Sequence, residues 1–334
     1  MALRLVLRGA LHVALILGVS GLWAAAPARA DSDPATSYPA RPVHLVVGFS
    51  AGGGNDTFAR ITAQKMSEIL KQPVLVDNKP GAGSIIATDF VAKAKPDGYT
   101  LLIGASGAMV INPAVYATLP YDSKRDFVPL TQIAHFPLML VVSAKSPIKT
   151  VADMVAYTKA HPEKSNYASS SVTFQLATEL FKLRTGAPME MVAYKGSGDS
   201  VMAVISGEVL CTIADTPPVA GQLTSGQIRG LAVTGDHRLA DFPDVPTMAE
   251  AGVNDAYFQI WSGIFAPKGT PPGIVAKLQA AAREAITSPE VSDKLKNLAV
   301  EPSGMAAEEF GQIIDRDLRT AVEIAHAAHV RVEQ

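Results

Sequence analysis

The sequence predicts an α/β fold of two domains, each built from a mostly parallel β-sheet flanked by helices. Three observations predict it. The chain has 334 residues, of which 48% are hydrophobic and 18% charged, enough for a large core and too long for one typical domain. Short β-branched runs alternate with amphipathic segments along the chain. Strands that alternate with helices form βαβ units, and these units give parallel sheets.

The first strand is expected at 43–49, where an apolar β-branched run lies between Pro42 and a glycine run. The first helix is expected at 56–70, because apolar residues recur there at helical spacing until Pro73 ends it. The same reasoning predicts further strands at 74–76, 99–103, 138–143, 166–168, 189–194, 210–214, 228–234 and 262–266. It predicts further helices at 84–94, 151–160, 173–185, 199–206, 272–287, 289–298 and 306–327.

The first 30 residues have the pattern of a secretory signal peptide. Arg4 and Arg8 precede an almost wholly apolar stretch at 9–26, and Ala28-Arg29-Ala30 follows with small residues at the two positions that a signal peptidase reads. We expect cleavage after Ala30, with an uncleaved membrane anchor as the alternative. No later stretch approaches the roughly 18–20 apolar residues of a membrane helix, so the mature chain is expected to be soluble and periplasmic.

The charge balance argues against nucleic acid as a partner. The whole chain carries 29 basic and 31 acidic side chains. Removal of the first 30 residues, which hold three arginines and no acid, leaves 26 basic and 31 acidic side chains and a net charge of −5. Such a chain has no basic run for nucleic acid or anionic lipid. The one cysteine, Cys211, lies in an apolar run and is expected to be buried, and no Cys/His cluster indicates a metal or cofactor.

Loops of small residues follow five of the expected strands, at 50–55, 81–84, 104–107, 169–171 and 196–198. In a parallel α/β domain such loops lie at the carboxyl edge of the sheet, where ligands bind. Each offers unpaired backbone N–H groups and the positive end of a helix dipole, which together attract an anion without a basic side chain. The run Gly52-Gly53-Gly54 is the strongest of these signals, because a plain turn needs only one glycine.

Alternative interpretations apply to single residues in and near these loops. Asp56 and Ser84 also fit as helix N-caps. Asp215 either accepts a hydrogen bond from a ligand or caps the following helix, and Lys195 either pairs with a carboxylate or is a surface lysine. The aromatic rings of Phe49 and Phe174 belong either to a pocket wall or to the core.

Two other functional classes fit the loops less well. A nucleotide-binding loop needs Gly-Lys-Ser/Thr where Gly54-Asn55-Asp56 stands, and the dinucleotide pattern fails after Gly54. A hydrolase elbow needs Gly-x-Ser-x-Gly, and the loop around Ser106 has a different spacing. A catalytic triad is spatial rather than sequential, so a hydrolytic enzyme stays open as a remote alternative.

A series of ordered motifs runs along nearly the whole mature chain. They include Tyr38-Pro39-Ala40-Arg41-Pro42, Gly52-Gly53-Gly54-Asn55-Asp56, Asn78-Lys79-Pro80-Gly81-Ala82-Gly83, Pro96-Asp97-Gly98-Tyr99-Thr100, Leu119-Pro120-Tyr121-Asp122, Tyr194-Lys195-Gly196, Val245-Pro246-Thr247-Met248 and Phe265-Ala266-Pro267-Lys268-Gly269-Thr270-Pro271. By this series the chain resembles the Bug-type solute-binding proteins of tripartite tricarboxylate transporters. The resemblance implies a two-lobed periplasmic-binding-protein fold, type II-like, which captures a small carboxylate and delivers it to a membrane permease.

The resemblance also implies domain boundaries and contacts. We expect lobe 1 at 40–137 plus 262–334 and lobe 2 at 138–261, joined by two crossing strands. The ligand contacts carried over by position are Phe49, Ser50, Ala51, Gly52, Gly53, Asn55, Asp56 and Ser106 in lobe 1, and Ser170, Ser171, Thr173 and Asp215 in lobe 2. The segment 169–175 departs from the family pattern, and Gln175 falls where a histidine is common, so the lobe 2 contacts carry over least well.

The sequence therefore predicts a monomeric transport receptor without a cofactor or enzymatic activity. The alternative is a periplasmic ligand sensor for a signalling partner, which would use the same closure. The ligand class stays open among dicarboxylates, tricarboxylates, amino acids and aromatic acids, since all of these satisfy N–H donors.

Overall fold

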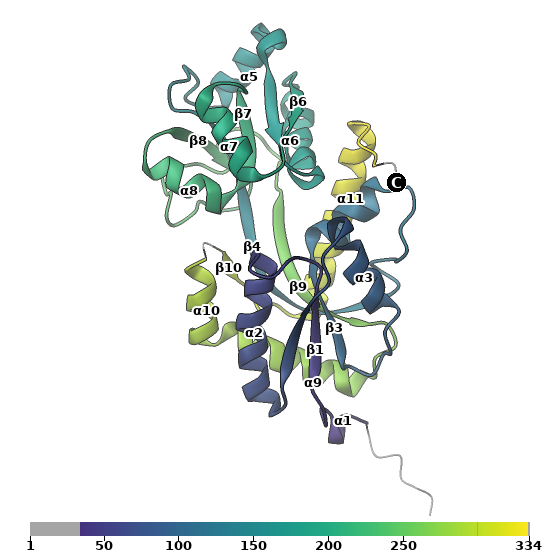
Figure 1. Cartoon of the computed structure of the whole chain (residues 1–334). Coiled ribbons are helices and arrows are strands. Elements are labelled where there is room, and N and C mark those ends of the chain that lie inside the picture. The colour runs from purple at the N-terminus through teal and green to yellow at the C-terminus, as the bar shows by residue number, and fades with distance from the viewer. Residues whose placement is uncertain (1–33, 299, 333–334) are drawn as a thin grey trace, which may run out of the picture.

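The computed structural model describes residues 34–298 and 300–332, except for the side chain of Pro217. The predicted signal peptide, residues 1–30, lies outside the described residues. Figure 1 shows two lobes, with two long strands running between them and the helix α11 (Ala307–Ala327) rising along one side. Across the described ranges, no helix combines the length and the apolar character needed to span a membrane.

The lobe 1 sheet contains strands β1 (Val43–Val47), β2 (Val74–Asn78), β3 (Thr100–Ala105), β9 (Gln259–Pro267), β10 (Glu301–Pro302) and the first half of β4 (Phe127–Ser143). Their order is β2-β1-β3-β9-β4, with β10 also paired to β4. The strands β1, β2 and β3 are parallel, whereas β9 is antiparallel to both of its neighbours.

The lobe 2 sheet begins with the second half of β4. It adds β5 (Asn166–Ser169), β6 (Glu190–Ala193), β7 (Cys211–Asp215) and β8 (Ile228–Val233). The strand β5 is parallel to β6 and β7, while β4 lies antiparallel between β7 and β8. The predicted two-lobed α/β class with helix-flanked sheets is confirmed. The sheets are mixed rather than mostly parallel, because the long strands β4 and β9 pair antiparallel with all of their neighbours. The residue boundaries of the lobes stay a prediction.

Helices cover both faces of each sheet. They are α1 (Pro34–Ser37), α2 (Gly54–Leu70), α3 (Ile85–Ala92), α4 (Asn112–Val115), α5 (Val151–Ala160), α6 (Val172–Thr185), α7 (Ser197–Ser206), α8 (Thr216–Thr224), α9 (Pro272–Thr287), α10 (Pro289–Lys296) and α11, with the shorter turns η1 (Ala82–Ser84), η2 (Gly107–Ile111, a π-helix) and η3 (Pro162–Lys164). One apolar core cluster runs through both lobes and includes Phe310 of α11 and Phe181 of α6. The opposite face has separate clusters, one under α2 and α9 and one under α7 and α8.

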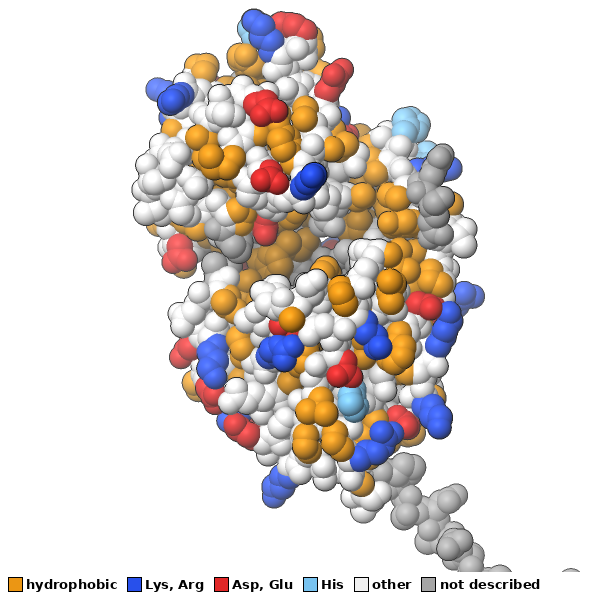
Figure 2. All heavy atoms as spheres, in the orientation of Figure 1, with side chains coloured by type: hydrophobic (Ala, Val, Ile, Leu, Met, Phe, Trp, Pro, Cys, Tyr) orange, Lys and Arg blue, Asp and Glu red, His pale blue; other side chains and the backbone are white. Residues whose placement is uncertain are grey.

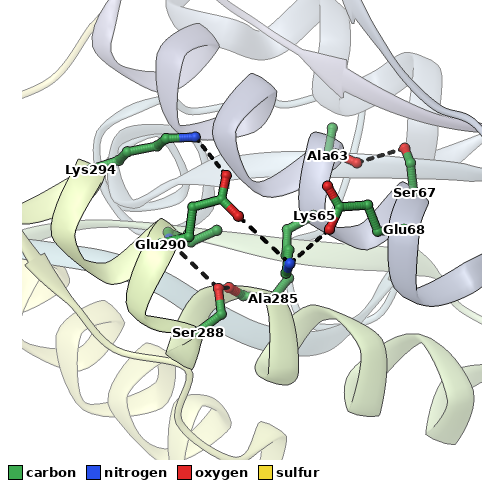
Figure 3. Close-up of polar contacts among 9 residues, drawn as sticks. Ala63, Lys65, Ser67, Glu68, Ala285, Ser288, Glu290 and Lys294 are labelled. Carbon is green, nitrogen blue, oxygen red and sulfur yellow. Dashed lines mark hydrogen bonds and ion pairs between the residues drawn. The ribbon is translucent and has the colours of Figure 1, made fainter.

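Figure 3 shows how α2 meets α9 and α10 at their polar edges. Lys65 Nζ lies 2.7 Å from Glu68 Oε2 and 3.6 Å from Glu290 Oε2, and Lys294 Nζ lies 2.8 Å from Glu290 Oε1. These side chains are partly exposed, and such ion pairs contribute only about 0–1 kcal/mol. The packing of these helices therefore depends on the buried apolar residues, such as Met66 and Leu295, that line the same elements.

Three sequence expectations need correction. The strand expected at 138–143 is the second half of β4, which begins at Phe127; its first half contains Pro129 and Pro137 and so hid the strand pattern. The loop expected at 104–107 is shorter than predicted, because Gly107 begins η2, and α4 follows it in a segment for which no element was predicted. Gly104 lies inside β3 and not in the loop that follows it. It is a glycine because the ring of Phe265 fills the space where a side chain would be: a Cβ there would lie 2.7 Å from that ring.

The two N-cap interpretations fare differently, and neither side chain caps a helix. The N-cap of α2 is Gly53, and Asp56 is the third residue of the helix. Ser84 occupies the N-cap position of α3 as predicted, but its side chain makes no capping bond and its backbone has a left-handed φ of 72°. The predicted burial of Cys211 is confirmed, since this free thiol is fully buried.

Candidate functional site

The carboxyl ends of the two sheets face each other across the crossing strands. Ala105, the last residue of β3, pairs with Ser262, which pairs with Ala134 of β4. Asp215, the last residue of β7, pairs with Leu138, which also belongs to β4. Four residues of extended chain separate these two positions on β4, a span of about 13 Å. The loops that follow β3 and β7 therefore line one space, and Figure 2 shows the surface hollowed between the lobes.

The loop after β1 is held by hydrogen bonds on its inner side and is exposed to solvent on its outer side. The N–H of Gly52 donates to Asp56 Oδ2 at 2.8 Å, and the side chain of Asn78 donates to the Phe49 carbonyl at 3.0 Å. Phe49 is half-buried against the core, whereas Ser50, Ala51, Gly52 and Gly53 are exposed. Gly52 has a φ of 84°, the left-handed region that favours glycine. The loop thus presents main-chain groups rather than side chains.

Asp56 supports this loop as a buried ion. Only 4% of its side chain is exposed, and it accepts hydrogen bonds from Gly52, from Arg60 Nε at 3.0 Å and from Asn78 Nδ2 at 2.9 Å. The hydrogen bond from Arg60, which is the largest cause, lowers the pKa of Asp56 to about 2. The pair also neutralises Arg60, the nearest arginine in sequence to the glycine loop.

Asn55 and Ser106 are both tied to the start of β9. The hydroxyl of Ser262 donates to Asn55 Oδ1, and the backbone N–H of Trp261 donates to Ser106 Oγ at 3.3 Å. These bonds leave the Asn55 amide nitrogen and the Ser106 hydroxyl proton as donors. The Ser106 hydroxyl is therefore bonded to a backbone N–H, and within the described ranges it has no histidine partner of the kind a hydrolase would need.

The lobe 2 residues gather at the start of α6. Ser171 is the N-cap position of α6, but its side chain makes no capping bond. Ser170 Oγ lies 3.4 Å from the hydroxyl of Ser197, the first residue of α7, so the loops after β5 and β6 are adjacent. Thr173 reaches lobe 1, since a Cβ placed on Gly107 would lie 3.8 Å from Thr173 Oγ1.

Asp215 occupies the N-cap position of α8 without capping it. Its Oδ1 is buried and has no hydrogen-bond partner in the part of the chain that the structure describes, and the same holds for Thr216 Oγ1. The capping interpretation of Asp215 is therefore wrong. A buried carboxylate oxygen without a partner is costly, so this position carries unused capacity to accept a hydrogen bond.

The helices α2, α6, α7 and α8 all begin at this space without a side-chain cap. By contrast, Thr150 caps α5 and Ser288 caps α10. The helices α9 and α11 also lack a cap, so position at the carboxyl edges, and not the missing cap alone, defines the site. Uncapped amides with aligned dipoles can stabilise an anion.

The structure thus places the twelve predicted contacts at the facing edges of the two sheets, with Asp56 beneath the loop rather than on its surface. Sequence reasoning did not select Ser197 as a contact, although it lies in one of the five small-residue loops. It also missed Trp261 and Ser262, whose place is set by the pairing of β9. Residues 34–298 and 300–332 contain no group of three or more His, Cys, Asp or Glu side chains that could hold a metal ion.

Comparison with known proteins decides the family. A family model described as "Tripartite tricarboxylate transporter family receptor", TctC, matches residues 58–329. The chain belongs to this receptor family. Protein BugT of Bordetella pertussis is 38% identical over 284 residues, which is 84% of this chain and 87% of that protein. A UPF0065 protein from the gbd 5′ region of Cupriavidus necator is 38% identical over 292 residues, 86% of this chain and 87% of that protein.

Similar solved structures agree with this assignment. An R. palustris protein with adipate is 35% identical with a TM-score of 0.75, over 88% of this chain and 99% of that one. A Polaromonas TctC solute-binding protein without ligand has a TM-score of 0.79 at 27% identity, over 87% and 99% of the chains. MatC from Rhodopseudomonas palustris, with bound malate, has a TM-score of 0.71 at 29% identity, over 86% and 99%. The family resemblance drawn from the motifs is confirmed.

Proposed function

We propose that this receptor binds a small carboxylate between its lobes in the periplasm and delivers it to the permease of a tripartite tricarboxylate transporter. The observation that carries the proposal is the set of four uncapped helix starts that meet at the facing sheet edges. Two similar receptors, with adipate and with malate, hold dicarboxylates. The receptor acts as a monomer after removal of residues 1–30.

The proposed contacts are main-chain groups of the glycine loop, the Asn55 amide, the Ser106 hydroxyl, and the serine and threonine side chains at the start of α6. No lysine or arginine is among them. Asp215 would accept a hydrogen bond from a hydroxyl or amino group of the ligand, or from a water between them. Asp56 would act through the loop that it holds, because its oxygens already accept internal hydrogen bonds.

The lobes would close about β4 and β9. These two strands are paired along residues 127–137 and 259–267, and β4 continues into the lobe 2 sheet. Two crossing strands form a hinge that absorbs domain closure. We propose the division at 137/138 and 261/262 on this basis.

A thermal-shift screen of chain 31–334 against adipate, malate, citrate, glutamate and benzoate tests the function. A ligand at 100 times its Kd should stabilise the receptor by about 2.7 kcal/mol. Gly53→Val should abolish that shift, because a branched side chain would cover the loop amides. It should not unfold the receptor, since Gly53 has an ordinary extended backbone with φ −75° and ψ 166°.

The matched control is Gly311→Val, a glycine in α11 whose Cβ position has no atom within 4 Å apart from the local helix backbone. This variant should keep the ligand-induced shift. An undiminished shift in Gly53→Val would remove the glycine loop from the site. The absence of a shift with any carboxylate would refute the proposed ligand class.

A further inference from the structure

We propose that the receptor has a second small-molecule site beside the hinge, which binds a free amino acid with an apolar side chain. The site is a cavity of about 310 Å³ between α11, η2, the end of α6 and the segment that leads into β9. This volume is at the lower end of the range for ligand pockets, which suits one small molecule.

One wall of the cavity is apolar. It consists of Val110 and Ile111 from η2, Phe258 from the segment before β9, and Ala321 from α11. All four side chains belong to or border the core cluster that joins the lobes. This wall would receive an aliphatic or aromatic side chain.

The other wall includes Arg316, whose guanidinium is held in one orientation by its neighbours. Arg316 donates from Nε and Nη2 to Asp317 Oδ1 at 3.0 and 2.8 Å, which leaves Nη1 outside that pair. Its guanidinium lies 4.6 Å from the ring centroid of Tyr257, a cation–π contact that holds it in place. Asp317 Oδ2 accepts from the Trp261 indole N–H at 2.9 Å. Arg316 is thus pre-oriented to bind a carboxylate.

Charges of both signs line the cavity in equal number. Arg184 from α6 donates to the backbone carbonyl of Asp255 at 3.1 Å and pairs with Glu323 of α11 at 3.2 Å. The carboxylate of Asp255 forms no ion pair in the described ranges, so it is available for an ammonium group. Glu323 compensates the charge of Arg184, so the match to a zwitterion depends on Nη1 of Arg316, which lies outside the pair with Asp317, and on the carboxylate of Asp255.

The cavity differs from the proposed carboxylate site in composition and position. Ser106 is the one predicted contact that lines it within the described ranges. Its walls come from both lobes: η2 and α11 belong to lobe 1, whereas Arg184 and Asp255 belong to lobe 2. An occupant would therefore bind one lobe orientation better than another, and its affinity would be coupled to that of the carboxylate.

Calorimetric titration of the purified receptor with L-leucine tests the site. N-acetyl-L-leucine, which lacks the ammonium group, and L-leucinamide, which lacks the carboxylate, should each bind at least about tenfold more weakly than leucine. Equal binding of all three would overturn the zwitterion assignment. The absence of leucine binding at millimolar concentration would overturn the site.

Substitutions of residues that line the cavity test whether leucine binds there. Arg316→Gln, Asp255→Asn and the cavity-filling Thr320→Phe should each weaken leucine binding at least about tenfold, while the circular-dichroism spectrum stays unchanged. Arg319→Gln, a neighbouring exposed arginine of α11 that does not line the cavity, should leave it unchanged. Gly53→Val should also leave it unchanged, which separates this site from the carboxylate site. Binding that is lost in Gly53→Val but kept in Arg316→Gln would assign leucine to the cleft and overturn the proposal.

Discussion

At the residue scale, the conformation of the glycine loop depends on one buried carboxylate. Asp56 accepts from the Gly52 amide and is itself held by Arg60 and Asn78. The three glycines that the sequence presents as one run have different roles. Gly52 alone has a positive φ, Gly53 ends the loop as the N-cap, and Gly54 begins α2.

The low pKa of Asp56 predicts acid sensitivity. The hydrogen bond from Arg60 lowers this pKa from 3.8 to about 2, so the ionised form stabilises the fold above the unfolded pKa. That stability should be lost as the pH falls from about 4 to about 2. At pH 5, Asp56→Asn should lower the free energy of unfolding by about 2 kcal/mol, and the difference should shrink toward zero at pH 2.

Urea unfolding of both forms across this range measures the effect. A difference between the wild type and Asp56→Asn that stays constant with pH would show that the ionised carboxylate does not stabilise the loop.

At the element scale, the contact of α11 with β9 depends on a missing side chain. A Cβ on Gly263 would lie 2.4 Å from the ring of Phe310, which packs on Trp261 at 4.9 Å between ring centroids. The helix could not approach the strand this closely over any other residue. This contact also places Arg316 and Asp317 beside the hinge.

Gly263→Ala should therefore destabilise the receptor by about 1–3 kcal/mol through overpacking. Gly311→Ala is the matched control on α11, because no atom lies within 4 Å of its Cβ position. It should stabilise the helix by about 0.5–1 kcal/mol, since alanine is the better helix former. Thermal unfolding of the two variants should shift in opposite directions; equal shifts would contradict this packing argument.

A histidine joins the loop after β8 to β10. His237 Nδ1 lies 2.6 Å from Asp236 Oδ1, and its Nε2 lies 3.0 Å from Glu301 Oε2. Glu301 also lies 3.3 Å from His135 Nε2 of β4. The hydrogen bond with Asp236 is the largest cause that raises the pKa of His237. Arg238, Asp241 and Lys296 line a cavity together with His237 and Glu301.

The raised pKa predicts how this contact depends on pH. The charged imidazolium is fully present below the ordinary value of about 6.5, and the contact weakens as the pH rises through the raised pKa. An NMR titration should give His237 a pKa above 6.5. Asp236→Asn should lower that pKa more than Glu301→Gln does, and the reverse order would contradict the ranking of the two partners.

At the scale of the whole molecule, the two lobes share an apolar core on one side of the crossing strands and not on the other. One apolar core cluster runs through both lobes along α11, η2 and α6, whereas the opposite face has one cluster in each lobe. The continuous core should act as the pivot of closure. The space at the start of α2 and α8 should then open and close most, since no shared core holds those elements together.

Small-angle scattering should show a smaller radius of gyration when a saturating carboxylate binds. Gly107→Trp should prevent that decrease, because Gly107 of η2 faces Thr173 of α6 on the pivot side, where a large ring would wedge the lobes apart. Gly311→Trp, on the open surface of α11, should still permit it. A decrease of equal size in Gly107→Trp would refute a pivot at this contact.

The sequence by itself determined the α/β class, most of the elements and the family, because alternation and ordered motifs are local properties of the chain. It also determined that small-residue loops lie at the carboxyl edges of parallel strands. Only the tertiary structure decided that β4 runs unbroken from Phe127 into the second sheet, and that Ser106 is tied to Trp261. It also decided that Asp56 lies beneath the loop and that Arg184, Arg316, Asp255 and Asp317 line one cavity beside α11. These features depend on strand pairing and on contacts between residues far apart in sequence, and no local pattern encodes such distances.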